Sequence, residues 1–164
     1  MLKPNVAEAI NRQIHAELYS AYLYLSMAAC LQSRNLAGMA HWLRVQAREE
    51  LGHAMKFYDH VLERGGTVVL GALEAPPANW ESPLAAFEDA YQHECHITSR
   101  IHKLADLAAE EKDYALSVLL NWFVKEQVEE EATALAIVEK LRMVAGSNSG
   151  LLMLDHHLGQ RQAE

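Results

Sequence analysis

The chain contains the same spacing of metal-ligand residue types twice. The two sets are Glu17, Glu50 and His53 in the first half, and Glu94, Gln127 and Glu130 in the second half. In each set an acid lies 33 residues before a pair of ligand-type residues at positions i and i+3 (50 − 17 = 127 − 94 = 33). A pair with this spacing shares one face of an α-helix. The repeat therefore predicts two similar helical units.

Each unit is predicted to be a helical hairpin, because its midpoint lies in a polar, turn-like stretch. The midpoints fall near residue 34, within 33–35, and near residue 111, within 110–113. Residues equally far from a hairpin turn lie at the same level of the two helices. All six side chains are therefore predicted at one level of a four-helix bundle, which is the arrangement of a dinuclear metal site.

Helical periodicity indicates that these residues point inward. The four faces run through Ile10, Ile14, Glu17, Ala21 and Tyr24; Met39, Leu43, Gln46, Glu50 and His53; Phe87, Tyr91, Glu94 and Thr98; and Leu120, Phe123, Gln127, Glu130 and Ala134. Neither Lys nor Arg falls on these faces. Unpaired buried carboxylates are costly, so four of them at one level favour a site that binds cations. Two divalent ions would balance the four charges.

The fold is predicted to be all-α, with one domain over residues 1–164. Helices are expected at about 5–33, 36–64, 82–111 and 113–145, with a short one at about 149–159. Ser82 and Pro83 are typical of a helix start, and Asp113 can cap the fourth helix. Residues 65–81 form a linker whose extended length, ~56 Å, can run back along a 30-residue helix of ~45 Å. The two hairpins are therefore expected to be joined by a crossover.

Composition excludes several classes of protein. No long uncharged apolar stretch is present, and residues 1–5 lead into an amphipathic helix without a signal-peptide core, so we expect a cytoplasmic protein outside the membrane. The two cysteines lack a CxxC partner, which argues against a disulfide scaffold. A net charge of −8 argues against nucleic-acid binding and suits a protein that attracts cations.

The ligand types indicate which metal the site would take. Carboxylates with a single imidazole suit iron or manganese better than copper, and they offer zinc no thiolate. Glu50 would bridge two metals, with Glu17 and His53 completing one of them. Glu94 and Glu130 would complete the other. Gln127 is a weaker, neutral ligand or a hydrogen-bond partner.

With these motifs, the chain resembles the haem-free bacterial and archaeal ferritins over essentially its whole length. The motifs are Glu17, Glu50-x-x-His53, Glu94 and Gln127-x-x-Glu130. The resemblance implies a ferritin-like four-helix bundle with a long crossover and a short fifth helix. It also implies oxidation of iron(II) by oxygen or hydrogen peroxide at two iron positions in each subunit, and storage of ferric mineral in a homo-oligomeric shell of 24 subunits.

Haem is not expected from this resemblance. Bacterioferritins carry a haem-ligating Met directly after the glutamate of the second helix, where this chain has Leu51. They also repeat Glu-x-x-His on the fourth helix, where this chain has Gln127-x-x-Glu130. Both differences favour the haem-free group.

Four further residues could extend the site. Glu49, Glu126 and Glu129 each precede an inward-facing residue by one position, and their counterparts in the resembling family form a third iron site. The alternative is that residues 129–131 are a solvated acidic face. Tyr24 lies two turns from Glu17 and could hydrogen-bond Glu94 or supply an electron, or it could be core packing only.

Alternative functions remain at the level of sequence. One is a dinuclear oxidase or peroxidase that acts on another substrate, and another is a non-catalytic structural shell subunit. Assembly is predicted because the helix is apolar nearly all round from Tyr19 to Leu31. Leu18, Tyr22, Leu25 and Ala29 form a second apolar stripe for another subunit.

Overall fold

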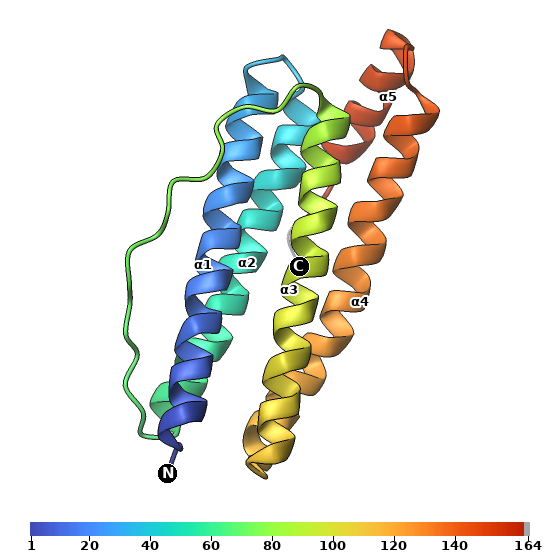
Figure 1. Cartoon of the computed structure of the whole chain (residues 1–164). Coiled ribbons are helices and arrows are strands. Elements are labelled where there is room, and N and C mark those ends of the chain that lie inside the picture. The colour runs from blue at the N-terminus through green and yellow to red at the C-terminus, as the bar shows by residue number, and fades with distance from the viewer. Residues whose placement is uncertain (163–164) are drawn as a thin grey trace.

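The computed structural model describes residues 1–162 as five α-helices (Figure 1). They are α1 (Pro4–Gln32), α2 (Ala37–Glu63), α3 (Pro83–Glu110), α4 (Tyr114–Met143) and α5 (Asn148–Leu158). The predicted class, a four-helix bundle with a crossover and a short fifth helix, is confirmed. The last two residues of the predicted 1–164 domain lie outside the described residues. Within residues 1–162, no helix has an apolar stretch long enough to cross a membrane.

The long helices form two antiparallel hairpins. In Figure 1, α1 lies against α2 and α3 lies against α4, and the segment between α2 and α3 runs beside α1 from one end of the bundle to the other. Asn35 (φ 61°) and Lys112 (φ 54°) adopt left-handed conformations in the two hairpin turns. Each lies one residue beyond a midpoint predicted from the sequence. Residues that are equally distant from these turns therefore lie at the same level of the two hairpins.

Side-chain caps define where three of the helices begin. The Ser82 hydroxyl accepts a hydrogen bond from the Ala85 N–H (3.0 Å), and Asp113 Oδ1 accepts one from the Leu116 N–H (3.0 Å). At the start of α5, the Ser147 hydroxyl accepts one from the backbone N–H three residues on (3.1 Å). All three satisfy donors that a helix N-terminus leaves free. Asp113 also forms an ion pair with Arg64 Nη1 (2.9 Å), which ties the end of α2 to the start of α4.

The short α5 packs across one end of the bundle. The Asp155 carboxylate accepts hydrogen bonds from the backbone N–H groups of Gly38 (3.1 Å) and Met39 (2.8 Å), so it caps α2 from a distant part of the chain. Residue 38 must be small, because a Cβ on Gly38 would lie 1.7 Å from the Asp155 carbonyl oxygen. Leu154 and Leu158 are buried beside this contact.

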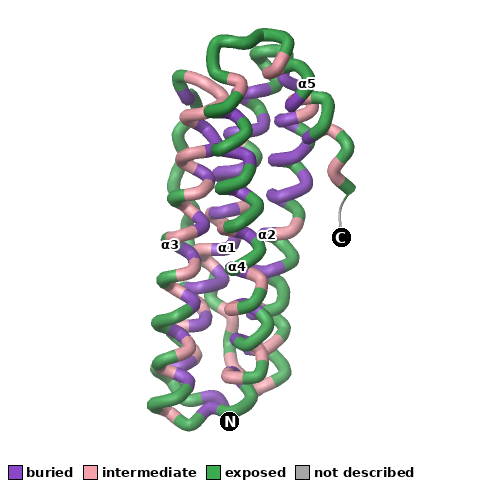
Figure 2. The backbone as a smooth tube through the Cα atoms, turned by 90° about the vertical axis from the view of Figure 1, so that its right-hand side faces the viewer, coloured by how far each residue is buried: buried purple, intermediate pink, exposed green. Residues whose placement is uncertain are grey.

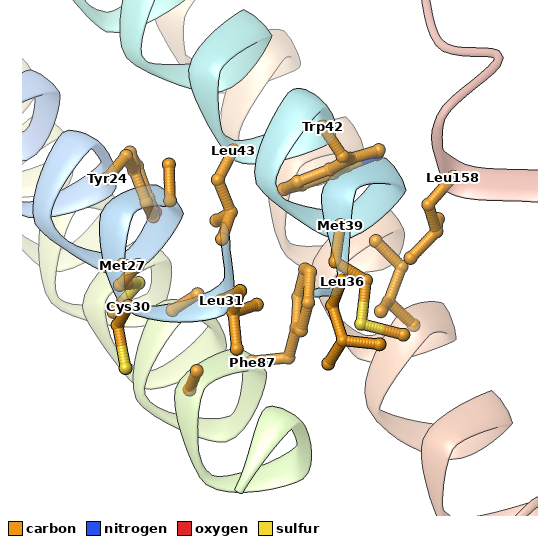
Figure 3. Close-up of a cluster of buried hydrophobic side chains, with 14 of the residues drawn as sticks. Tyr24, Met27, Cys30, Leu31, Leu36, Met39, Trp42, Leu43, Phe87 and Leu158 are labelled. Carbon is orange, nitrogen blue, oxygen red and sulfur yellow. The ribbon is translucent and has the colours of Figure 1, made fainter. Parts of the chain in front are cut away.

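The interior consists of two apolar clusters, one toward each end of the bundle. The first includes Trp42 and Phe87 near α5, where Figure 3 shows the buried side chains converging from several helices. The second, toward the other end, includes Phe57 and Phe123, whose rings stack with centroids 4.1 Å apart. Buried residues recur along the length of every long helix, as the purple segments in Figure 2 show. Between the two clusters, each of the four long helices contributes at least one buried polar side chain.

Candidate metal centre

The six predicted ligands form the polar layer between the two apolar clusters. On α1, the layer falls between Ile14 of one cluster and Leu23 of the other. All six side chains are buried, with exposed fractions between 1% and 7%; they are Glu17, Glu50, His53, Glu94, Gln127 and Glu130. All four long helices contribute, as the repeated spacing requires.

The structure brings five of these residues into two overlapping groups. Glu17, Glu50 and His53 each offer a ligand atom within 4.8 Å of the others. A second group with the same limit contains Glu50, Glu94 and Glu130. Glu50 belongs to both groups, which is the geometry of a carboxylate between two adjacent cations. The two groups are those that the sequence analysis assigned to the two metals.

Two buried glutamines orient the carboxylates, and sequence reasoning did not give them this role. The Gln13 amide donates to Glu17 Oε1 (2.7 Å). The Gln46 amide donates to Glu50 Oε1 (2.7 Å) and to Glu130 Oε2 (2.8 Å). Each glutamine lies four residues before a ligand glutamate, on the same helical face. That repeated Gln-x-x-x-Glu spacing is the sequence feature from which this role could have been predicted.

Tyr24 and Gln127 both contact Glu94. The buried Tyr24 hydroxyl donates a hydrogen bond to Glu94 Oε1. Gln127 Nε2 donates to Glu94 Oε2 (3.1 Å), to the Glu94 carbonyl oxygen (3.3 Å) and to Thr98 Oγ1 (3.3 Å). Gln127 thus uses its amide N–H groups within the protein, while Tyr24 fixes the other oxygen of Glu94.

The electrostatics of the layer are those of carboxyl groups short of positive charge. Burial, followed by the charge of Glu50, raises the pKa of Glu17 to about 8 and that of Glu94 to about 8. Burial and the charge of Glu94 raise the pKa of Glu130 to about 8. The pKa of Glu50 is also well above its ordinary value, through burial and Glu130. Without cations, the layer holds protons; a bound cation would displace them.

Two buried atoms in this layer test whether the residues present fit a metal ion. Within residues 1–162, Glu17 Oε2 and His53 Nδ1 are buried and have no hydrogen-bond partner. Buried polar atoms normally have partners. Both atoms belong to residues of the group that includes Glu50, and His53 Nδ1 lies 3.4 Å from Glu50 Oε2. An oxygen and a nitrogen left free beside a carboxylate fit a divalent cation.

The three outer acids occupy different surroundings. Glu126 joins a third group with His53 and Glu130, again within 4.8 Å. Glu49 forms an ion pair with Arg161 Nη2 (2.5 Å). Glu129 is exposed and belongs to none of the groups found among the described residues. Glu49, His53 and Glu126 also line one surface cavity of about 280 Å³, which leads to the imidazole.

Fold and site together define a class: helical bundles with a crossover connection that carry a buried, carboxylate-rich cluster able to hold metal ions between their four long helices. A family model described as a ferritin-like domain matches residues 7–144. A bacterial non-haem ferritin of Bacteroides fragilis is 41% identical over 161 residues, covering 98% of this chain and 100% of the relative. One of Staphylococcus saprophyticus is 36% identical, covering 98% of this chain and 96% of the relative.

Solved structures agree with these matches. An open-pore ferritin from the archaeon Archaeoglobus fulgidus superposes with a TM-score of 0.98 at 56% identity, covering 99% of this chain and 100% of that chain. A structure described as a humanized archaeal ferritin gives 0.99 at 53% identity, covering 100% and 99%. The chain belongs to the ferritin family, within its non-haem prokaryotic branch.

Proposed function

We propose that this chain stores iron, and that it oxidises iron(II) to iron(III) at the buried layer before the ferric product is deposited as mineral. The observation that carries the proposal is the position of Glu50 in two adjacent buried ligand groups. Two iron(II) ions bound side by side supply two electrons together. Membership of the non-haem ferritins supports iron as the substrate.

Each ligand has a defined part in this reaction. Glu17 and His53 would hold one iron(II), Glu94 and Glu130 would hold the other, and Glu50 would contact both. Oxidation of two iron(II) ions releases two electrons, which with two protons reduce oxygen to hydrogen peroxide, or hydrogen peroxide to water. Ionised carboxylates stabilise iron(III) more than iron(II), because the added positive charge is buried among them.

Gln127 and Tyr24 would support the second iron position. Their hydrogen bonds hold Glu94 with a fixed orientation before iron arrives. Tyr24 could also supply an electron when fewer than two are available from iron. No haem is needed for either step.

Glu49, Glu126 and Glu129 are proposed as ligands of a third iron. The cavity of about 280 Å³ lined by Glu49 and Glu126 supports this proposal, because it adjoins His53 of the first group. The exposed Glu129 would contribute by attracting cations to the cavity mouth or by turning inward when iron is bound.

A hollow homo-oligomeric shell, with 24 subunits as in the resembling family, would hold the mineral. Support comes from the apolar stripe on α1, where Tyr22 is 46% exposed and Leu25 is 50% exposed. Two large apolar side chains one turn apart on a helix surface are typical of an interface. Closed symmetric assembly would bury them.

The test is aerobic addition of two iron(II) ions per subunit with ferric absorbance followed by stopped flow. Glu50→Gln removes the shared carboxylate and keeps its size, so we expect fast oxidation to be lost. Glu110→Gln is the matched control, since Glu110 is an exposed glutamate at the end of α3. Equal fast oxidation in both variants would contradict the proposal. A protein that binds both cations but leaves iron(II) unoxidised would indicate another substrate.

A further inference from the structure

The segment that follows α5 returns to the metal layer through one side chain, Arg161. Its guanidinium donates to Glu49 Oε2 (2.5 Å) and to Gln46 Oε1 (2.8 Å). The same group lies over the Trp42 ring, 4.2 Å from the centroid. The Arg161 carbonyl oxygen contacts His41 Nε2 (2.8 Å). Arg161 is thus held by four residues of α2.

These contacts form a built network. The Arg161 and Glu49 side chains are 20% and 19% exposed, so their ion pair is largely removed from water. A planar guanidinium that pairs with a carboxylate, donates to an amide and stacks on an indole uses the properties that distinguish Arg from Lys. A loosely held surface arginine would have no reason to satisfy all three.

Arg161 is connected to the ligand carboxylates through a single residue, Gln46. A guanidinium can only donate hydrogen bonds, so the Gln46 oxygen must face Arg161. The Gln46 amide nitrogen is then directed to Glu50 Oε1 and Glu130 Oε2 (2.7 and 2.8 Å). Arg161 therefore favours the orientation of Gln46 in which its amide nitrogen donates to both ligand carboxylates.

The same arginine occupies the carboxylate that a cation in the outer cavity would need. Glu49 lines the cavity with His53 and Glu126, and the basic residues Arg48 and Lys56 line it as well. A divalent cation bound to Glu49 Oε2 would replace the guanidinium and would repel it at close range. Binding of such a cation and retention of Arg161 on Glu49 are therefore opposed.

We propose that Arg161 is a positioning residue that keeps Glu49 closed to cations until the segment after α5 releases it. The proposal rests on the function proposed above, in that the layer takes divalent cations, and adds a regulator to its outer part. Because coupling is reciprocal, a cation that binds Glu49 must loosen residues 159–162, and loss of Arg161 must tighten that cation.

Cobalt(II), which is not oxidised by air on this timescale, can test the proposal without iron chemistry. We would titrate the assembled, metal-free protein by calorimetry and by visible absorption. We expect Arg161→Gln to bind its third cobalt about tenfold more tightly than the unaltered chain, with two cobalt ions still bound in the inner layer. A tenfold change in affinity corresponds to ~1.4 kcal/mol.

Two further variants separate charge from mere structural disturbance. Arg161→Lys keeps the charge but lacks the planar fork that donates to Gln46 and Glu49 from two separate nitrogens. The affinity for the third cobalt should therefore rise by less than tenfold. Arg142→Gln is the matched control, because Arg142 is another arginine held by ion pairs, here with Glu88 (2.7 Å) and Glu139 (2.6 Å), far along α4. It should leave all cobalt affinities unchanged.

The unaltered chain provides a measurement that does not depend on any variant folding. Hydrogen exchange of residues 159–162 should accelerate as the third cobalt binds, and not while the first two bind. The proposal would be overturned if Arg161→Gln bound the third cobalt no more tightly than the unaltered chain. It would also be overturned if hydrogen exchange in residues 159–162 did not change when the third cobalt binds. If the unaltered chain failed to bind the first two cobalt ions, that result would instead contradict the proposed function.

Discussion

Replacing Glu50 by Gln should stabilise the metal-free protein while it abolishes the dinuclear site. Glu50 is buried and lies in both ligand groups. Its charge is the second cause, after burial, of the raised pKa of Glu17 and Glu94. The substituted amide would keep an oxygen that can accept from the Gln46 amide, as Glu50 Oε1 does at 2.7 Å. The substitution thus removes a charge at little cost in hydrogen bonding.

The magnitude follows from the pKa values. A carboxyl whose pKa is about 8 when folded and 4.5 when unfolded binds more protons in the folded chain. Its favourable contribution is complete below pH 4.5 and is lost as the pH rises to about 8. A difference of ~3.5 in pKa corresponds to ~5 kcal/mol, an upper bound for one such group. Because Glu50 shares this penalty with its neighbours, we expect Glu50→Gln to raise the free energy of unfolding by ~2–4 kcal/mol at pH 8.

Thermal unfolding at equal protein concentration, with chelator present, would measure this gain. It should shrink as the pH is lowered from 8 to 6.5, because the protons that keep the buried carboxyls neutral are then bound at a smaller cost in free energy. The window stays above the ordinary histidine pKa of 6.5, because burial lowers the pKa of His93 to about 4 and its effect on stability appears only below 6.5. Adding cobalt(II) should reverse the order of the two proteins. A metal-free Glu50→Gln variant less stable than the parent at pH 8 would show that the Glu50 carboxyl does not destabilise the metal-free layer.

Three other variants test the inner ligands, the outer acids and the subunit interface separately. His53→Ala should weaken one of the two inner cations and slow iron oxidation without unfolding the helices, as calorimetry and stopped flow would detect; unchanged affinity would exclude the imidazole as a ligand. Joint replacement of Glu49, Glu126 and Glu129 by Gln should leave the first oxidation of two irons intact but change later turnover and iron stoichiometry. If those first irons oxidised as slowly as in Glu50→Gln, the outer acids would belong to the inner site. Leu25→Arg should break assembly, so that light scattering reports a particle near the 18.4 kDa chain mass and not many times that mass; an unchanged particle would show that the α1 stripe is not an interface.

The bundle and its ligand layer were predictable because they depend on local periodicity and distance from a turn. The 33-residue repeat specifies depth, and helical spacing specifies the face, so Glu50 could be placed between two groups without coordinates. The contact of Arg161 with Glu49 spans 112 residues and depends on how α5 crosses the bundle end. No periodic pattern encodes that crossing. Contacts of this kind become visible only when the packed helices are in place.

The contacts of the three outer acids, Glu49, Glu126 and Glu129, were also not predictable from the sequence. Each of them precedes an inner residue by one position, which predicts that they lie together in a second cluster beside the first. In the structure, however, Glu126 lies close to His53 and Glu130, whereas Glu49 forms an ion pair with Arg161. A rotation of about 100° per residue locates a helix face. It does not determine which neighbour a long, partly exposed carboxylate selects.

Anomalous diffraction at the iron edge, from crystals soaked in iron(II) without oxygen, would locate the bound iron ions directly. We expect two strong peaks in each subunit, one among Glu17, Glu50 and His53 and the other among Glu50, Glu94 and Glu130. Both should disappear or weaken greatly in Glu50→Gln crystals. Iron found only at surface positions, with neither peak beside Glu50, would contradict the assignment of the dinuclear site.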